Sequence, residues 1–120
     1  MVRDGQSGRT EEESMGQADG ESLGLDAVAE VPTDAAERYA KQLLTHLGHK
    51  VSMEPIEGEP KGGRLVFAYA TATVIPAADR LTMRATAADA DSLARVQDVL
   101  KRHLEKFGAR RELVVEWRTV

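Results

Sequence analysis

The sequence predicts a two-layer α+β domain, in which a mainly antiparallel sheet carries two helices on one face in the order β-α-β-β-β-α-β. Two stretches place apolar residues at helical spacing, and each has one apolar stripe, which is typical of a helix that covers another layer. The other apolar segments alternate with polar residues, as half-buried antiparallel strands do. These one-sided elements bury their apolar surfaces best against each other.

The first predicted strand covers residues 26–31 and ends at Pro32, because proline donates no hydrogen bond to a sheet. A helix is expected over residues 34–47, capped by Thr33 or Asp34. Its apolar positions form a single wide stripe, made of Ala36, Tyr39, Ala40, Leu43, Leu44 and Leu47.

Gly48 is expected to end this helix in a left-handed conformation. A short strand over 51–54 follows. The composition of residues 57–63, which include Gly62 and Gly63, then predicts a turn. Residues 64–75 read as one long strand or two shorter ones, with a face switch near residues 68–70 if the strand bulges.

The second half predicts one further strand, a second helix and a last strand. The strand over residues 81–86 alternates, with Leu81, Met83 and Ala85 inward. Asp89 or Asp91 is expected to cap the helix, and Gly108 to close it. Its apolar stripe consists of Leu93, Val96, Leu100, Leu104 and Phe107. The last strand is expected to point Leu113, Val115 and Trp117 into the core.

The charge is unevenly distributed along the chain of 120 residues, which has a formal net charge of -4. Residues 1–24 hold six acidic and two basic residues, so they carry the whole excess, and residues 25–120 are balanced. We interpret residues 1–24 as a disordered acidic tail, with a docking arm as the alternative, and residues 25–120 as a single domain. A strongly basic nucleic-acid-binding protein is not expected.

Cysteine is absent from the sequence, which excludes disulfides, thiolate metal sites and cysteine nucleophiles. No stretch has the apolar length of a signal peptide or a membrane span. We therefore expect a cytoplasmic protein that does not enter a membrane.

The domain resembles a bacterial family catalogued as domain of unknown function 2218. Residues 38–43, 46–50, 63–67, 93–97, 103–107 and 112–117 carry the resemblance. Family members often have Phe-Gly where this chain has Tyr69-Ala70, which argues against a glycine-dependent bulge at that point. The resemblance implies a small cytoplasmic bacterial protein, and it implies no activity, cofactor or site residue.

Three histidines are the candidate metal ligands. His46 and His49 are three residues apart at the end of the first helix, and His103 lies on the second helix. If the helices pack side by side, their imidazoles can approach one divalent ion, for which a carboxylate such as Glu105 is a candidate fourth ligand. The competing interpretation is three surface histidines, with His49 stabilised by the helix dipole.

The densest basic run is Lys101, Arg102, His103, Lys106, Arg110 and Arg111. A solvated helix face is the favoured interpretation, since acidic residues dilute the run. A site for phosphate, an acidic partner or nucleic acid is the alternative. The acidic tail is a further candidate to lie on this patch.

No catalytic constellation is evident, so an enzyme is not favoured. The Gly62-Gly63 pair lacks the Lys-Ser/Thr of a phosphate-binding loop, and no serine lies in a Gly-x-Ser-x-Gly turn. Trp117 is interpreted as a core residue rather than a stacking platform.

The sheet face away from the helices offers a partner surface. Val66, Ala68, Val74 and Val114 are expected to point there, and an apolar patch of this kind suits a homodimer or a small apolar ligand. We therefore expect a non-enzymatic binding or interaction module. The alternative is a metal- or iron-related accessory protein that uses His46, His49 and His103.

Overall fold

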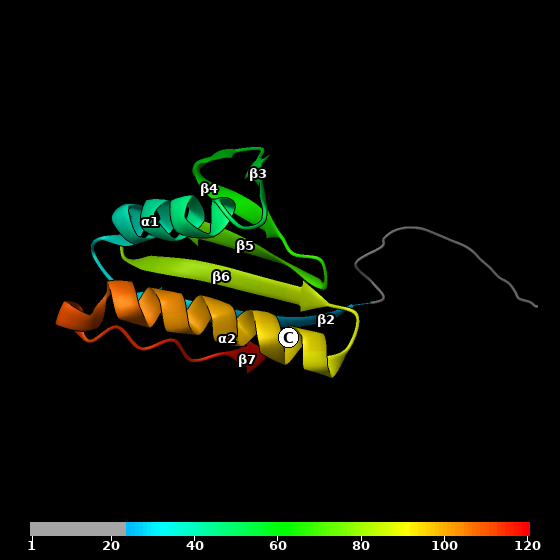
Figure 1. The fold of residues 1–120 in the computed structure, drawn as a ribbon. Coiled ribbons are helices and arrows are strands. Elements are labelled where there is room, and N and C mark those ends of the chain that lie inside the picture. Colours follow the sequence, from blue (N-terminus) through cyan, green and yellow to red (C-terminus); the bar gives the residue numbers. More distant parts are fainter. Residues whose placement is uncertain (1–23) are drawn as a thin grey trace, which may run out of the picture.

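The computed structural model describes residues 24–120, so the predicted acidic tail lies outside the described residues except for Gly24. The predicted fold class is confirmed: an open antiparallel sheet carries both helices on one face (Figure 1). The elements in chain order are β2 (Leu25–Pro32), α1 (Ala36–Gly48), β3 (Ser52–Ile56), β4 (Glu59–Val66), β5 (Ala70–Pro76), β6 (Arg80–Ala87), α2 (Ala90–Phe107), the 3-10 turn η2 (Ala109–Arg111) and β7 (Arg118–Thr119).

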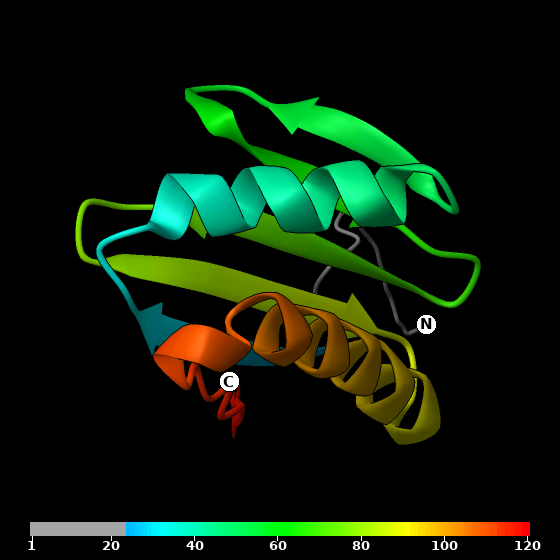
Figure 2. The same ribbon diagram turned by 60° about the vertical axis from the view of Figure 1, so that its left-hand side comes forward.

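The six strands lie in the order β3-β4-β5-β6-β2-β7, and every neighbouring pair is antiparallel. Strand β2, although it comes first, is inserted between β6 and β7, with Leu25 opposite Ala87 and Pro32 opposite Arg80. The two helices run side by side across this sheet (Figure 2). Helix α1 packs mainly on β4 and β5, and α2 on β6 and β2.

The core lies between the helices and the sheet and is almost entirely aliphatic. Both predicted helix stripes face it, and the strands contribute every second residue. Among residues 24–120, Tyr39 is the one aromatic side chain counted with the buried core residues. The largest side chains without solvent contact are Leu43, Leu65, Leu81, Met83, Leu100, Leu104, Val31, Val74, Val96 and Val115.

The long stretch of residues 64–75 is two strands joined by a turn at residues 67–69, where the Phe67 N–H donates to the Ala70 carbonyl at 2.8 Å. The turn resets the alternation, so that Ala70, Ala72 and Val74 all face the helices. The expectation that Val74 points to the open sheet face is therefore wrong. A bulge would have kept one strand, whereas a turn makes two.

The predicted turn over residues 57–63 is also wrong in extent. The chain reverses at residues 57–58, where Gly58 has φ +83°, and both Gly62 and Gly63 belong to β4. Close approach explains the pair. A Cβ on Gly62 would lie 2.7 Å from the Val74 carbonyl oxygen, and one on Gly63 would lie 3.1 Å from the side chains of Leu44 and Met53. Glycine is needed here for space rather than for a turn.

The first helix has different ends from those predicted. Ala35 precedes it without a side-chain cap, while Asp34 forms an ion pair with Arg111 at 2.6 Å. Gly48 is the last helical residue and does not adopt a positive φ, because the helix passes to His49 in a right-handed conformation. The predicted Asp34 cap and the left-handed stop of α1 are therefore wrong, whereas Thr33 Oγ1 accepts a hydrogen bond from the Ala35 N–H at 3.1 Å just before the helix begins.

The second helix begins as predicted. The carboxylate of Asp89 accepts a hydrogen bond from the Ser92 N–H at 2.8 Å. Hydrogen bonds from Ser92, its backbone N–H foremost, lower the pKa of the Asp89 carboxyl. Gly108 ends the helix, and Leu113 packs so closely on it that a side chain there would collide with Leu113.

The last predicted strand, residues 113–117, is not a strand, and only Arg118–Thr119 pairs with β2. The backbone of Val115 is bound by α2 instead: its N–H donates to Glu105 Oε2 at 2.9 Å and its carbonyl accepts from Lys101 Nζ at 3.2 Å. Val115 is wholly buried, and Leu113 and Trp117 pack on the core, so the predicted inward positions are confirmed. Two side chains of α2 therefore form the backbone hydrogen bonds that a neighbouring strand would otherwise provide at Val115.

None of the helices within residues 24–120 combines the length and the apolar character that crossing a lipid bilayer requires.

Candidate binding clefts of the helix layer

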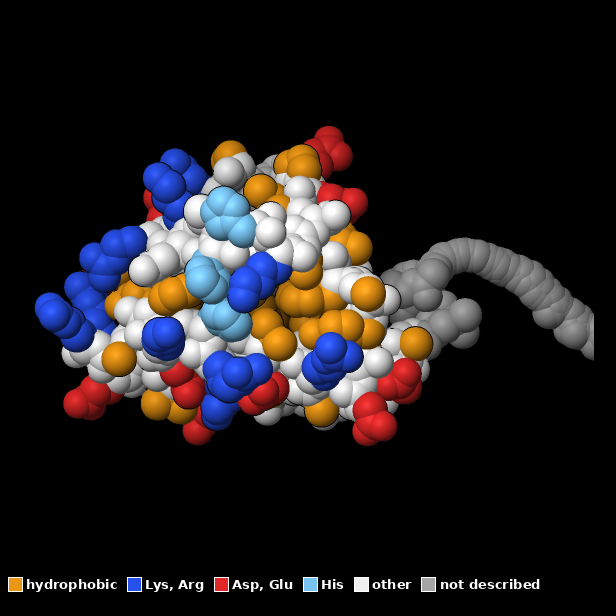
Figure 3. Space-filling model, viewed as in Figure 1, with side chains coloured by type: hydrophobic (Ala, Val, Ile, Leu, Met, Phe, Trp, Pro, Cys, Tyr) orange, Lys and Arg blue, Asp and Glu red, His pale blue; other side chains and the backbone are white. Residues whose placement is uncertain are grey.

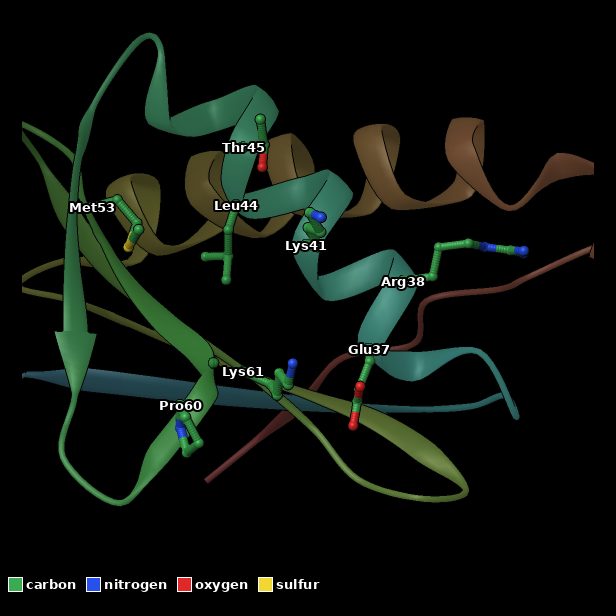
Figure 4. Close-up of a pocket in the computed structure, with 9 residues that line it drawn as sticks. Glu37, Arg38, Lys41, Leu44, Thr45, Met53, Pro60 and Lys61 are labelled. Carbon is green, nitrogen blue, oxygen red and sulfur yellow. The ribbon is translucent and has the colours of Figure 1, made fainter.

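Two clefts flank α1 on the helix side of the molecule. The first, the hairpin cleft, lies between α1 and the β3–β4 hairpin and has a volume of about 580 Å³ (Figure 4). The second, the interhelical cleft, lies between α1 and α2 and has about 500 Å³. Arg38, Lys41 and Thr45 line both clefts, so one polar ridge of α1 separates them.

The hairpin cleft combines an apolar floor with a charged rim. Leu44 comes down from α1 toward Met53 of β3, and Glu37 and Lys61 lie at the opposite end (Figure 4). Leu44 is buried, whereas Met53 is 50% exposed, which is unusual for an apolar side chain of that size. The close approach of both side chains to Gly63 brings this floor together. An apolar floor and a polar rim are typical of a small-molecule site.

The cations of the rim have no acidic partner among the described residues. Neither Arg38, Lys41 nor Lys61 takes part in an ion pair there. Arg38 is held by Tyr39, whose hydroxyl lies 3.5 Å from its Nη2 and whose ring centroid lies 5.1 Å from its Cζ. Glu37 is the one carboxylate that lines the hairpin cleft. The rim therefore carries a net positive charge that an anionic group can neutralise.

The structure brings two of the three candidate histidines together. The ring centroids of His46 and His103 are 5.1 Å apart, and the Phe107 ring meets His46 edge-on at 5.6 Å. His103 Nδ1 lies 2.7 Å from the Val99 carbonyl oxygen. Since a carbonyl only accepts, Nδ1 carries a proton in this contact, and in the neutral form of the ring Nε2 is the acceptor.

His49 lies at the end of α1 and lines the interhelical cleft with His46, while His103 and His46 share a smaller hollow of about 190 Å³. Within residues 24–120, no group of three or more His, Asp or Glu side chains is placed to hold a metal ion. The assignment of His46, His49 and His103 as metal ligands stays a prediction.

The surroundings of His46 are electropositive. Partial desolvation lowers the pKa of its imidazole, and the positive charges of His103, Lys50, His49 and Lys106 lower it further. A divalent cation carries twice the charge of a proton, so the same neighbours oppose its binding more strongly. Figure 3 shows the histidines in the middle of this face with Lys and Arg side chains around them. The local charge around His46 is therefore positive when its basic neighbours are protonated.

The basic run of the second helix is divided among separate partners. Arg102 pairs with Asp98 at 2.7 Å, Arg111 with Asp34 at 2.6 Å, and Lys101 with Glu105 at 3.7 Å. In the described part of the chain, Lys106 and Arg110 are left without an acidic partner. The run therefore does not form one continuous phosphate-binding surface.

The opposite face of the sheet is mixed in character: Val66 lies there opposite Thr71, as predicted, and so do Ile75 and Val28, but polar side chains make up much of the face. Four threonines of β5 and β6 lie there, with Thr71 opposite Thr86 and Thr73 opposite Arg84. The cations of this face are paired: Arg64 with Glu54, Arg84 with Asp26, and both Arg80 and Arg118 with Glu30. A homodimer through this face stays a prediction, and light scattering of the concentrated protein will test it.

The two clefts are not evident from the sequence. Arg38 and Lys41 look like ordinary residues of a polar helix face, and Met53 belongs to a short alternating strand. Only the folding of the β3–β4 hairpin back against α1 brings them together. The one available signal is the pair of glycines at residues 62–63, whose absent side chains leave room for that approach.

Comparison with known proteins extends over most of the domain. The chain is similar to the protein PA4090 from Pseudomonas aeruginosa, whose NMR structure shares 29% sequence identity with a TM-score of 0.65. The match covers 78% of this chain and 95% of PA4090. A comparison with curated proteins finds no significant match. A family model described as "Uncharacterized protein conserved in bacteria (DUF2218)" matches residues 28–118. The chain therefore belongs to the DUF2218 family.

Proposed function

We propose that the domain is a non-enzymatic binding module whose clefts on either side of α1 take a small amphipathic anion. The observation that carries the proposal is the set of cations on the ridge between the clefts that have no ion-pair partner within residues 24–120, above the partly exposed apolar floor. A carboxylate or phosphate head fits Arg38 and Lys41. An apolar body fits Leu44 and Met53 in the hairpin cleft.

Charge and volume both support this chemistry. The hairpin cleft of about 580 Å³ falls within the range of small-molecule sites, about 300–1,000 Å³. A carboxylate that meets an exposed cation gains about 0.5–1.5 kcal/mol, which is a factor of about 2–10 in affinity. Two such contacts and the burial of several methylenes give a specific site of moderate affinity.

Octanoate is the probe that tests the proposal, because it joins one carboxylate to one apolar chain. Titration followed by ¹H–¹⁵N NMR is expected to shift amides of residues 37–45 and 53–63. Lys41→Gln is expected to weaken binding about 2–10-fold. Glu37→Gln, which removes the one carboxylate of the hairpin cleft, is expected to strengthen it.

The matched control is Arg64→Gln, which removes a paired cation from the opposite sheet face and is expected to leave binding unchanged. Octanol separates the two contributions, since it keeps the apolar chain without the charge. Equal binding of octanol and octanoate, or equal affinity in Lys41→Gln and wild type, would contradict the proposal.

A divalent-metal role is the second candidate, supported by the 5.1 Å separation of the His46 and His103 rings and the free Nε2 of His103. Two imidazoles at this separation are able to meet one ion at ~2.0–2.1 Å each, with water completing the coordination. Zn²⁺ titration followed through the histidine ring protons tests it. Unshifted rings at millimolar Zn²⁺ would remove this candidate.

A further inference from the structure

A third hollow lies at the C-terminal end of α1, where the β4–β5 turn and α2 approach it. Its volume is about 950 Å³, and Met53 separates it from the hairpin cleft. Two of the five aromatic residues of the chain, Phe67 and Tyr69, line it side by side. Their ring centroids are 5.6 Å apart and both rings are only partly buried. Each presents part of its ring to the hollow.

The charged side chains that line this hollow are all basic among the residues that the structure describes. His49, Lys50 and Arg95 line it, and none of the lining residues is acidic. The Arg95 guanidinium carbon lies 4.2 Å from the centroid of the Tyr69 ring, and Arg95 forms no ion pair within residues 24–120. A guanidinium held by an aromatic ring rather than by a carboxylate keeps its N–H donors available to an anion.

The local fold explains why these groups meet. The hydrogen bond from the Phe67 N–H to the Ala70 carbonyl closes the turn at residues 67–69 and places both rings at its ends. The N–H groups of Lys50 and Val51 both donate to the Leu47 carbonyl, which holds these two residues close to the C-terminal end of α1. Arg95 lies in the first half of α2, which runs above this end of the sheet.

We propose that this hollow is a second binding site, distinct from the α1 clefts, for a planar aromatic molecule that carries a carboxylate or phosphate. Phe67 and Tyr69 supply ring faces and edges for stacking, and Arg95 with Lys50 supplies the positive charge. An aliphatic anion lacks the stacking contribution and a neutral aromatic lacks the charged one. The site therefore selects for both properties in one ligand.

The test is a titration with 2-naphthoate, followed by ¹H–¹⁵N NMR and by the ring protons of Tyr69. The amide shifts are expected to centre on residues 49–53, 66–70 and 95. Cyclohexanecarboxylate and 2-naphthalenemethanol are each expected to bind at least 5-fold more weakly. Arg95→Gln and Tyr69→Ala are expected to weaken naphthoate binding about 10-fold each, and Tyr69→Phe, which keeps the ring, less than 3-fold.

Two controls separate this site from the α1 clefts and from non-specific charge. Lys41→Gln weakens octanoate binding under the proposed function but is expected to leave naphthoate binding unchanged. Arg80→Gln, on the opposite sheet face, is expected to affect neither probe. Because Arg95 is exposed, its substitution leaves the fold intact even if the Tyr69 variants prove unstable.

Naphthoate affinity that is the same in Arg95→Gln as in wild type would overturn the proposal. So would naphthoate shifts that centre on the α1 clefts and disappear in Lys41→Gln. Equal binding of all three probes would also overturn it, because the site would then select neither ring nor charge.

Discussion

The two faces of the domain use the same kinds of residue in opposite ways. On the open sheet face every arginine named above forms an ion pair with an acidic side chain of a neighbouring strand: Arg64, Arg80, Arg84 and Arg118. On the helix face Lys101, Arg102 and Arg111 are paired, but the cations around the clefts and the hollow have no acidic partner among the described residues: Arg38, Lys41, Lys50, Lys61 and Arg95. The balanced total charge of residues 25–120 hides this difference.

The contrast teaches where to look for function in a domain without a catalytic motif. Paired surface charges satisfy each other and add little to binding a third group. Unpaired cations around apolar hollows keep their capacity for a ligand. The helix layer is therefore the face to test for binding, and the sheet face is the face to test for stability.

The largest expected effect separates two adjacent glycines of β4. Gly62→Ala places a Cβ 2.7 Å from the rigid Val74 carbonyl oxygen, and we expect a loss of about 1–3 kcal/mol in the free energy of unfolding. Gly63→Ala meets only the mobile ends of Leu44 and Met53, and we expect it to cost less than about 1 kcal/mol. Urea denaturation of both variants measures the difference. Equal losses would show that the two sides of β4 tolerate a side chain alike.

The next effect concerns the most shielded pair of the open face. Burial raises the pKa of the Asp26 carboxyl, but hydrogen bonds from Arg84 and Thr86, with the charge of Arg84, outweigh it, so the pKa is lowered. We expect Asp26→Ala to cost about 1–2 kcal/mol at pH 7, a value reduced for the exposure of Arg84.

The pH dependence of this variant follows from the sign of the shift. A carboxyl whose folded-state pKa lies below 3.8 stabilises the fold above that pH, and this contribution is lost as the pH falls through the folded-state value. The gap between wild type and Asp26→Ala is therefore expected to narrow as the pH falls below 3.8. A gap that stays constant from pH 7 to pH 3 would exclude the charged form of Asp26 as its source.

The helix face is expected to respond in the opposite way to loss of a charge. Because Lys41 has no acidic partner among the described residues, Lys41→Gln is expected to change the free energy of unfolding by less than about 0.5 kcal/mol. Arg84→Gln, the matched variant of the open face, is expected to destabilise the fold clearly more. Equal losses in the free energy of unfolding of the two variants would contradict the proposed difference between the faces.

The smallest effect is the pH dependence caused by His46. Its pKa in the folded protein is lowered below 6.5, so the unfolded chain binds protons more readily. The folded state is therefore expected to lose stability relative to a His46→Gln variant as the pH falls below about 6.5. Thermal melts at pH 7.5 and 5.5 compare the two proteins. If the wild type is more stable relative to the variant at pH 5.5 than at pH 7.5, the sign of this effect is opposite to the one predicted.

The elements predicted well from the sequence are those that one-dimensional patterns define. The stripes from Ala36 to Leu47 and from Leu93 to Leu104 identify both helices, and Asp89 identifies the start of the second. The errors lie where distant residues decide the local structure. Residues 113–117 alternate like a strand, but Glu105 and Lys101 of α2 bind the backbone of Val115 in place of a neighbouring strand.

The candidate sites were less predictable than the fold, for the same reason. The histidines are candidate metal ligands by residue type, but among the three only the rings of His46 and His103 lie close together. The clefts depend on a hairpin folding over a helix, and the aromatic hollow depends on a turn at residues 67–69 meeting Arg95 of α2. No spacing in the sequence encodes those meetings.

The position of β2 inside the sheet sets an order for the folding of the chain during synthesis. Strand β2, the first strand of the described residues, hydrogen-bonds mainly to β6. Leu25 therefore cannot pair with Ala87 until more than sixty further residues have been synthesised. Such non-local pairing slows folding, and apolar strand residues remain unpaired in the meantime. We therefore expect residues 25–32 to lack their main strand partner until β6 has left the ribosome, which leaves their backbone open to contacts with other chains in the meantime.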